Sequence, residues 1–216
     1  MFRGISVKEN EVGSIKADLL SNGISKLSNS QIYTLPYLPL ELHTNYLKEE
    51  IEIKTIPTFE NICFADKCGA EYYALKRNSL SENKIGLIIQ AELDLKQLSI
   101  DGRDFLYYIF EKLKYGKEPI RIKNTLRQIY GDPIEKYFDL YLGKNLNPFR
   151  ICDIIIQDKE IVRHHLLNQN CIKARFGIEF KHSFLVKLPI KNSSIKEVDL
   201  VSEYSSPKVA YNIVDY

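Results

Sequence analysis

The chain has 216 residues, of which 44% are apolar and 27% are charged, so wholesale disorder is excluded and one well-buried core is expected. The formal net charge is +2, from 30 basic and 28 acidic residues, and charge therefore gives no reason to expect a nucleic-acid or membrane partner. No apolar run reaches the roughly 18 residues that a membrane span requires.

The cysteines indicate a reducing compartment. Cys63, Cys68, Cys152 and Cys171 have irregular spacing that matches neither a zinc site nor a disulfide framework. The N-terminus also lacks the basic and then apolar layout of a signal peptide. We therefore expect reduced, mostly buried thiols in a cytoplasmic protein with no metal site.

The first expected strand is unusual because it contains a glycine. Phe2 and Ile5 supply its apolar side chains, and Arg3-Gly4 lies between them. A glycine inside a strand often marks a place where a ligand or another segment comes close to the backbone. The alternative is an exposed arginine beside a small bulge.

The first half of the chain then alternates between helix and strand. Residues 29–46 contain two prolines and are expected to be irregular, and the apolar density of 85–95 predicts a strand inside a sheet. The elements expected here are a helix over 11–21 that stops at Asn22-Gly23, a helix within 38–50, strands over 51–56 and 62–65, a helix over 67–77 and the strand over 85–95.

The middle of the chain is expected to be helical and the end to return to sheet. Helices are predicted over 104–114, 121–130, 132–142, 149–156 and 159–167, although 154–156 fits a strand equally well. Strands are predicted over 171–175, 183–190 and 195–201. This order predicts one mixed α/β domain over residues 1–216 and disfavours a doubly wound fold, since no glycine-rich turn follows a strand.

Two segments together resemble the ADP-ribosyltransferase family. They are FRGI near the N-terminus and NICFADKCGAEYYA over residues 61–74, the second being most similar to the poly(ADP-ribose) polymerase branch. The resemblance covers about the first 95 residues and implies a central split sheet with a helical middle insertion. The chain departs from the family at Arg3, where that branch has histidine, and at Cys63-Phe64-Ala65, where another branch has Ser-Thr-Ser.

The resemblance implies an NAD site formed by Arg3, Gly4, Phe64, Tyr72 and Tyr73. An arginine beside a glycine can bind a pyrophosphate, and the backbone of the glycine can pair with the nicotinamide amide. Tyr72 is the expected counterpart of the tyrosine that stacks on nicotinamide, and it is also expected to act in catalysis. The alternative for both tyrosines is core packing with the hydroxyl at the surface.

The resemblance also requires a carboxylate beside the ribose, because glycosidic cleavage passes through an oxocarbenium-like state. Glu179 is the expected catalytic carboxylate, since a loop before the strand at 183–190 would present it to the site. Some branches place the glutamate where Lys181, His182 or Ser183 stands here. The alternative for Glu179 is a solvated loop carboxylate.

Two other clusters contain residue types that are common in functional sites. Asp101-Gly-Arg-Asp104 is typical of a turn with a helix N-cap, and its two carboxylates around an arginine can also orient a ligand. His164 and His165 lie in an expected helix, where adjacent side chains point about 100° apart and cannot face one site.

The sequence therefore predicts an NAD-dependent ADP-ribosyltransferase that transfers ADP-ribose to a macromolecular acceptor, protein or nucleic acid. Free-standing transferases of this size resemble toxins and effectors, so delivery into a host cytoplasm is a further expectation. The alternatives are an NAD glycohydrolase, an inactive NAD-fold binding module, and an unrelated interaction protein.

Overall fold

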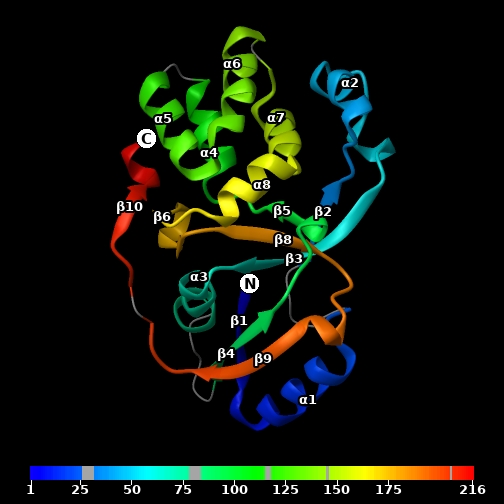
Figure 1. Ribbon diagram of the computed structural model, residues 1–216, viewed down its shortest axis with the longest axis vertical. Coiled ribbons are helices and arrows are strands. Elements are labelled where there is room, and N and C mark those ends of the chain that lie inside the picture. Colours follow the sequence, from blue (N-terminus) through cyan, green and yellow to red (C-terminus); the bar gives the residue numbers. More distant parts are fainter. Residues whose placement is uncertain (26–31, 78–83, 115–117, 145, 205) are drawn as a thin grey trace.

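A computed structural model of the protein describes residues 1–25, 32–77, 84–114, 118–144, 146–204 and 206–216. Within these ranges the fold is mixed α/β, with a seven-stranded sheet, a three-stranded sheet and eight α-helices, which confirms the predicted class (Figure 1). None of the helices in the described part is long and apolar enough to cross a membrane.

The strands of the large sheet follow the order β5-β8-β3-β1-β4-β9, and every pair is antiparallel. A seventh strand, β2, also pairs with β3. The bounds are β1 Phe2–Lys8, β2 Tyr33–Pro36, β3 Thr58–Ala65, β4 Lys84–Ala91, β5 Leu98–Ile100, β8 Ser183–Lys187 and β9 Ile195–Val201. The small sheet has the order β10-β6-β7, with β6 Cys171–Lys173, β7 Glu179–Phe180 and β10 Val209–Asn212.

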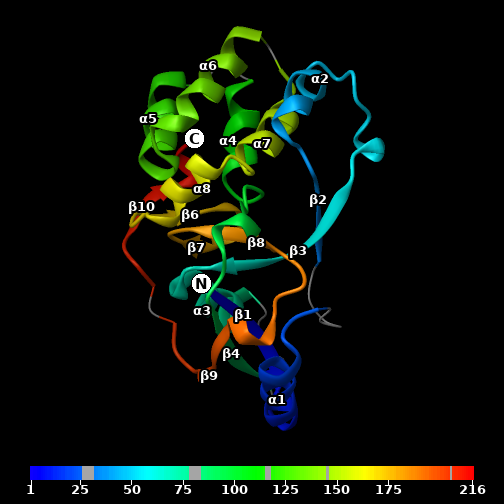
Figure 2. The same ribbon diagram turned by 45° about the vertical axis from the view of Figure 1, so that its right-hand side comes forward.

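Five of the eight helices form one continuous stretch of the chain between β5 and β6, as a helical middle predicts. In Figure 1 this group lies above β8 and β3, while β1, β4, β9 and α1 lie below them. The five are α4 Leu106–Leu113, α5 Pro119–Tyr130, α6 Glu135–Lys144, α7 Pro148–Ile155 and α8 Lys159–Leu166, and the others are α1 Val12–Asn22, α2 His43–Leu47 and α3 Lys67–Tyr72. Figure 2 shows the same division from a second side.

Local sequence signals explain several boundaries. Helix α1 ends at Gly23, whose φ of 73° is a backbone conformation that glycine adopts without strain. The side chain of Asp66 caps α3 by accepting a hydrogen bond from Gly69 N–H, and Asp158 caps α8 in the same way. Strand β4 is interior, as predicted, because β1 and β9 pair with its two edges.

Some predicted elements are wrong. Residues 51–56 do not form a strand but contain a short 3₁₀ turn, Ile53–Thr55. The reason is that Ile56 packs into a small separate core with Leu38, Tyr46 and Ile154, and no strand lies beside this segment in the described chain. The helix over 67–77 is α3 followed by a π-helical turn, Tyr73–Arg77, and the strands β2 and β10 were not predicted.

Candidate functional site

The large sheet is split between β1 and β3. These strands pair only at Phe2 and Ala65, whereas β1 pairs with β4 along its whole length. The edge of β3 that meets β1 at Ala65 meets β2 over Thr58–Asn61. Residues Ile62–Phe64 therefore face the interval between the two halves of the sheet.

The backbone of Gly4 points into this interval. Met1 and Ala91 exchange two backbone hydrogen bonds of 2.9 Å, so they form a hydrogen-bonded pair of the β1–β4 ladder. Such pairs alternate along an antiparallel ladder, and Gly4, opposite Ile88, occupies a position that does not bond to β4. The N–H and C=O of Gly4 thus point away from β4, and within the described chain no strand pairs with them there.

A glycine is required at this position for a second reason, because a helix crosses β1 at Gly4. A β-carbon placed there would lie 1.8 Å from the carbonyl oxygen of Ala70 in α3 and 2.8 Å from the backbone nitrogen of Ala74. The expected close approach to the glycine is therefore confirmed, and the segment that approaches its α-carbon is the helix. The N–H and C=O of Gly4, which point into the interval between β1 and β3, are the groups that remain available to a ligand.

Arg3 spans the interval beside Gly4. Its Nη1 donates a hydrogen bond of 2.6 Å to the carbonyl oxygen of Cys63 on β3. Burial lowers the pKa of this guanidinium, and the nearby titratable groups Cys63, Tyr33 and Tyr73 offset part of that shift. An arginine nevertheless remains charged at neutral pH. The alternative of an exposed arginine beside a bulge is wrong, because Arg3 is only partly exposed and is bonded to the facing strand.

The thiol of Cys63 lies next to Ser183, with Sγ and Oγ 3.5 Å apart. Burial, assisted by the charge of Asp101, raises the pKa of Cys63 to about 12, so the thiol stays protonated and is not a nucleophile at neutral pH. Ser183 is one of the three residues, with Lys181 and His182, that the sequence analysis considers for the position of a glutamate. Its side chain is a hydroxyl.

A buried carboxylate reaches the same place from the segment after β5. Asp101 is 5% exposed and accepts two hydrogen bonds from the side chain of Arg103, one of 2.7 Å from Nε and a shorter one from Nη2. The guanidinium of Arg103 stacks 3.3 Å from the ring centroid of Tyr33. Burial works to lower the pKa of Arg103, but Asp101 outweighs it and the net shift is upward.

The two adjacent tyrosines serve different neighbours. Tyr73 interacts electrostatically with Arg3, Asp101 and Arg103, and burial, assisted by Cys63 and Asp101, raises its pKa. Tyr72 instead packs its ring 5.7 Å from that of Tyr204 and donates a hydrogen bond of 3.3 Å to a backbone oxygen of the 175–177 turn. The side chain at the split is therefore Tyr73.

Besides Tyr72, two predicted site residues lie elsewhere. Phe64 is 1% exposed and belongs to the hydrophobic core, so its ring has no surface for a ligand. Glu179 is not in a loop but in β7, where it is 7% exposed. Its carboxylate accepts hydrogen bonds of 2.5 Å from Tyr204 and 2.8 Å from Ser206, and Lys173 lies 3.8 Å away. The expectation that a loop presents Glu179 to the site is wrong, because this carboxylate ties together distant segments of the chain.

We name the residues gathered at the split the Arg3 cluster: Arg3, Gly4, Tyr33, Cys63, Tyr73, Asp101, Arg103 and Ser183. Sequence reasoning selected Arg3, Gly4 and Tyr73, and it considered the Asp101–Asp104 segment mainly as a turn. It missed Tyr33, for which the sequence holds no signal, and it noted Cys63 only as part of a departure from the motif of the resembling family. Among the described residues, no group of three or more histidine, cysteine or acidic side chains is arranged to hold a metal ion.

Comparison with known proteins adds no relative. No family model matches the chain, and no significant match was found among curated proteins or solved structures.

Proposed function

We propose that the protein is an NAD-dependent ADP-ribosyltransferase whose site is the Arg3 cluster. The observation that carries the proposal is the outward-facing N–H and C=O of Gly4 at the split between β1 and β3. A primary carboxamide is one of the few ligand groups that can donate to such a C=O and accept from the N–H at the same time. Nicotinamide carries this group.

The neighbours of Gly4 support the same substrate. Tyr73, which interacts electrostatically with Arg3, the residue next to Gly4, supplies an aromatic ring of the kind that packs on a planar ring such as nicotinamide. Arg3 and Arg103 supply guanidinium groups that suit a pyrophosphate, with Arg103 about one third exposed and thus open to solvent. The chemistry of NAD in such a site is cleavage of the glycosidic bond, with release of neutral nicotinamide and transfer of ADP-ribose to a nucleophile on a macromolecular acceptor.

We assign the electrostatic role to Asp101 in place of Glu179. Asp101 is the buried carboxylate whose charge acts on Tyr73, Cys63 and Arg103. A fixed carboxylate in a poorly solvated site stabilises positive charge that develops on the ribose. The hydrogen bonds of Glu179 are already made to Tyr204 and Ser206, far along the chain.

A second candidate function, an inactive NAD-binding module, is favoured by one specific contact. Both carboxylate oxygens of Asp101 accept hydrogen bonds from Arg103, which neutralises the charge that cleavage requires. Under this alternative the cluster binds NAD without cleaving it. The first observation to make is therefore nicotinamide release by the purified protein.

A matched pair of substitutions tests the assignment. Asp101→Asn and Glu179→Gln each convert one buried carboxylate into an amide of the same shape. We expect NAD affinity within a few-fold of the parent for both, and release of nicotinamide reduced by about 100-fold or more for Asp101→Asn alone. Calorimetry gives the affinity, and a chromatographic assay of nicotinamide gives the rate.

Each other result has a definite meaning. NAD binding without nicotinamide release by the parent protein would assign the inactive module. A rate lost in Glu179→Gln and kept in Asp101→Asn would return the catalytic role to Glu179. Absence of NAD binding in the parent protein would contradict the proposal as a whole.

A further inference from the structure

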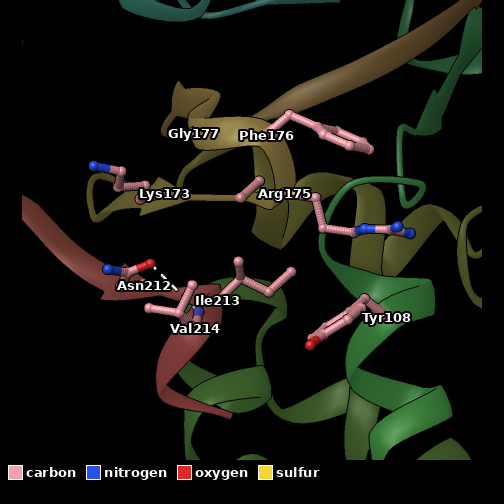
Figure 3. A pocket seen from close by; sticks show the side chains of 9 residues that line it. Tyr108, Lys173, Arg175, Phe176, Gly177, Asn212, Ile213 and Val214 are labelled. Atoms are coloured by element: carbon pink, nitrogen blue, oxygen red, sulfur yellow. Dashed lines mark hydrogen bonds between the residues drawn. The ribbon is translucent and has the colours of Figure 1, made fainter.

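A pocket of about 470 Å³ lies between the 175–177 turn, the C-terminal segment and helix α4. Lys173, Arg175 and Phe176 line it from one side, and Asn212 and Val214 line it from the other. Figure 3 shows the guanidinium of Arg175 extending between the rings of Phe176 and Tyr108. No residue of the Arg3 cluster lines this pocket.

The turn that forms one wall holds an aromatic ring out toward solvent. Phe176 has φ 61° and ψ 19°, a left-handed conformation that is uncommon for a residue with a side chain, and it is 67% exposed. Hydrogen bonds fix the turn from three directions: Ala174 N–H to Ile178, Arg175 N–H to the oxygen of Asp104, and Tyr72 Oη to the oxygen of Phe176. A non-glycine residue persists in this conformation where its surroundings determine it, often at ligand sites.

The pocket carries more positive than negative charge. Arg175 lies 5.5 Å from the ring centroid of Tyr108 and 5.2 Å from that of Phe176, and no carboxylate of the described chain forms an ion pair with it. Lys173 also lines the pocket, but it forms an ion pair of 3.8 Å with Glu179 and extends away from Arg175 (Figure 3). Lys112 does not line the pocket but lies nearby, with its ammonium group 5.0 Å from the ring centroid of Tyr108.

We propose that this pocket binds a mononucleotide unit, with the phosphate at Arg175 and the base against Phe176. Its volume falls within the range of about 300–1,000 Å³ that is usual for small-molecule sites. Aromatic rings exposed beside cations are the combination that binds a base and its phosphate together. The site is distinct from the carboxamide site at Gly4, and its existence does not depend on the proposed function.

The test uses adenosine 5′-monophosphate as the probe, with adenosine and ribose 5-phosphate as its two halves. We expect calorimetry to give a dissociation constant below about 1 mM for the nucleotide. Each half should bind at least about tenfold more weakly, because one lacks the phosphate and the other the base. Equal binding of the nucleotide and of ribose 5-phosphate would overturn the proposed role of the base.

Substitutions at exposed positions locate the site without disturbing the fold. Arg175→Gln should weaken nucleotide binding by about tenfold or more, whereas Arg163→Gln, the same change at an exposed position on α8, should leave it unchanged. Phe176→Leu removes the ring and should weaken binding by about fivefold or more. No detectable binding in the parent protein, or equal binding by the two arginine variants, would overturn the proposal.

Two further ligands complete the test. Nicotinamide distinguishes this pocket from the carboxamide site at Gly4, and an oligonucleotide shows whether the bound nucleotide belongs to a nucleic acid or is a free small molecule. Nicotinamide, which has no phosphate, should bind equally to the parent and to Arg175→Gln, so failure at one site is distinguishable from failure at the other. A single-stranded oligonucleotide that binds more tightly than the mononucleotide, with the same dependence on Arg175, assigns the site to nucleic acid. A free nucleotide that binds at least as tightly assigns it to the small molecule.

Discussion

The backbone of Gly4 and the carboxylate of Glu179 are both hydrogen-bonding groups, and they differ in whether residues of this chain serve as their partners. The carboxylate of Glu179 is bonded to Tyr204 and Ser206 and lies 3.8 Å from Lys173. The backbone of Gly4 points toward a strand that has already separated from β1. A group whose bonds are made within the chain holds the structure together, and a group whose bonds are not made is available to a ligand.

Tyr72, the last residue of α3, and Tyr73, the first residue of the turn after it, differ in the same way. Tyr72 completes contacts with Tyr204 and the 175–177 turn, on the side of Glu179. Tyr73 interacts with Arg3 and Asp101, on the side of Gly4. A change of one residue along the helix thus moves a side chain from the structural region to the proposed site.

The largest effect is expected at Gly4 itself. Gly4→Ala places a β-carbon 1.8 Å from the oxygen of Ala70, and we expect the free energy of unfolding to fall by more than about 3 kcal/mol. Gly13→Ala is the matched control, because nothing lies within 4 Å of its added β-carbon and helix α1 favours alanine by up to about 1 kcal/mol. Urea denaturation measures both, and equal stabilities would mean that α3 does not cross β1 at this residue.

Glu179 should behave as a structural residue. Glu179→Ala leaves the hydroxyls of Tyr204 and Ser206 without their acceptor, and we expect a loss of about 2–3 kcal/mol in the free energy of unfolding. Glu197→Ala, at an exposed position on β9, should change it by no more than about 0.5 kcal/mol. A Glu179→Ala variant as stable as the parent but unable to bind NAD would reverse the distinction drawn between the two regions.

A third prediction concerns the pH dependence of the strand that borders the site. His165 Nε2 accepts a hydrogen bond of 3.2 Å from the backbone N–H of Ser183, and burial, together with His182, lowers the pKa of His165 to about 3. The pKa of a histidine in the unfolded chain is near 6.5. Between about pH 6.5 and pH 3, His165 therefore binds a proton in the unfolded chain but not in the folded protein. The contribution of His165 to the free energy of unfolding is therefore complete above pH 6.5 and is lost as the pH falls. We expect a decrease of about 2 kcal/mol between pH 7 and pH 5.

Substitution of the histidine isolates its contribution. His165→Gln keeps an acceptor for Ser183 N–H and removes the titrating group. From pH 7 to pH 5, we expect the free energy of unfolding of the variant to decrease by about 2 kcal/mol less than that of the parent protein. Denaturation at pH 7, 6 and 5 makes the comparison. Parallel curves for the two proteins would show that His165 does not remain neutral in the folded state.

The sequence predicted those features that depend on local signals. The glycine in β1, the stop at Asn22-Gly23 and the interior strand β4 follow from the residues present and their immediate neighbours. The role of Glu179 could not be predicted, because Tyr204 and Ser206 lie 25 and 27 residues away in the chain. Nor could the stacking of Arg103 on Tyr33, which depends on how two distant segments meet at the split.

The central claim is that the backbone of Gly4 binds a carboxamide, and one measurement tests it directly. Gly4 is the single glycine that follows an arginine, so ¹³C-carbonyl arginine with ¹⁵N-glycine labels one peptide bond in the whole chain. We expect the amide signal of Gly4 to shift on addition of nicotinamide and to stay unchanged with nicotinic acid, whose carboxylate cannot donate to the C=O. A signal that nicotinamide leaves in place would contradict the account.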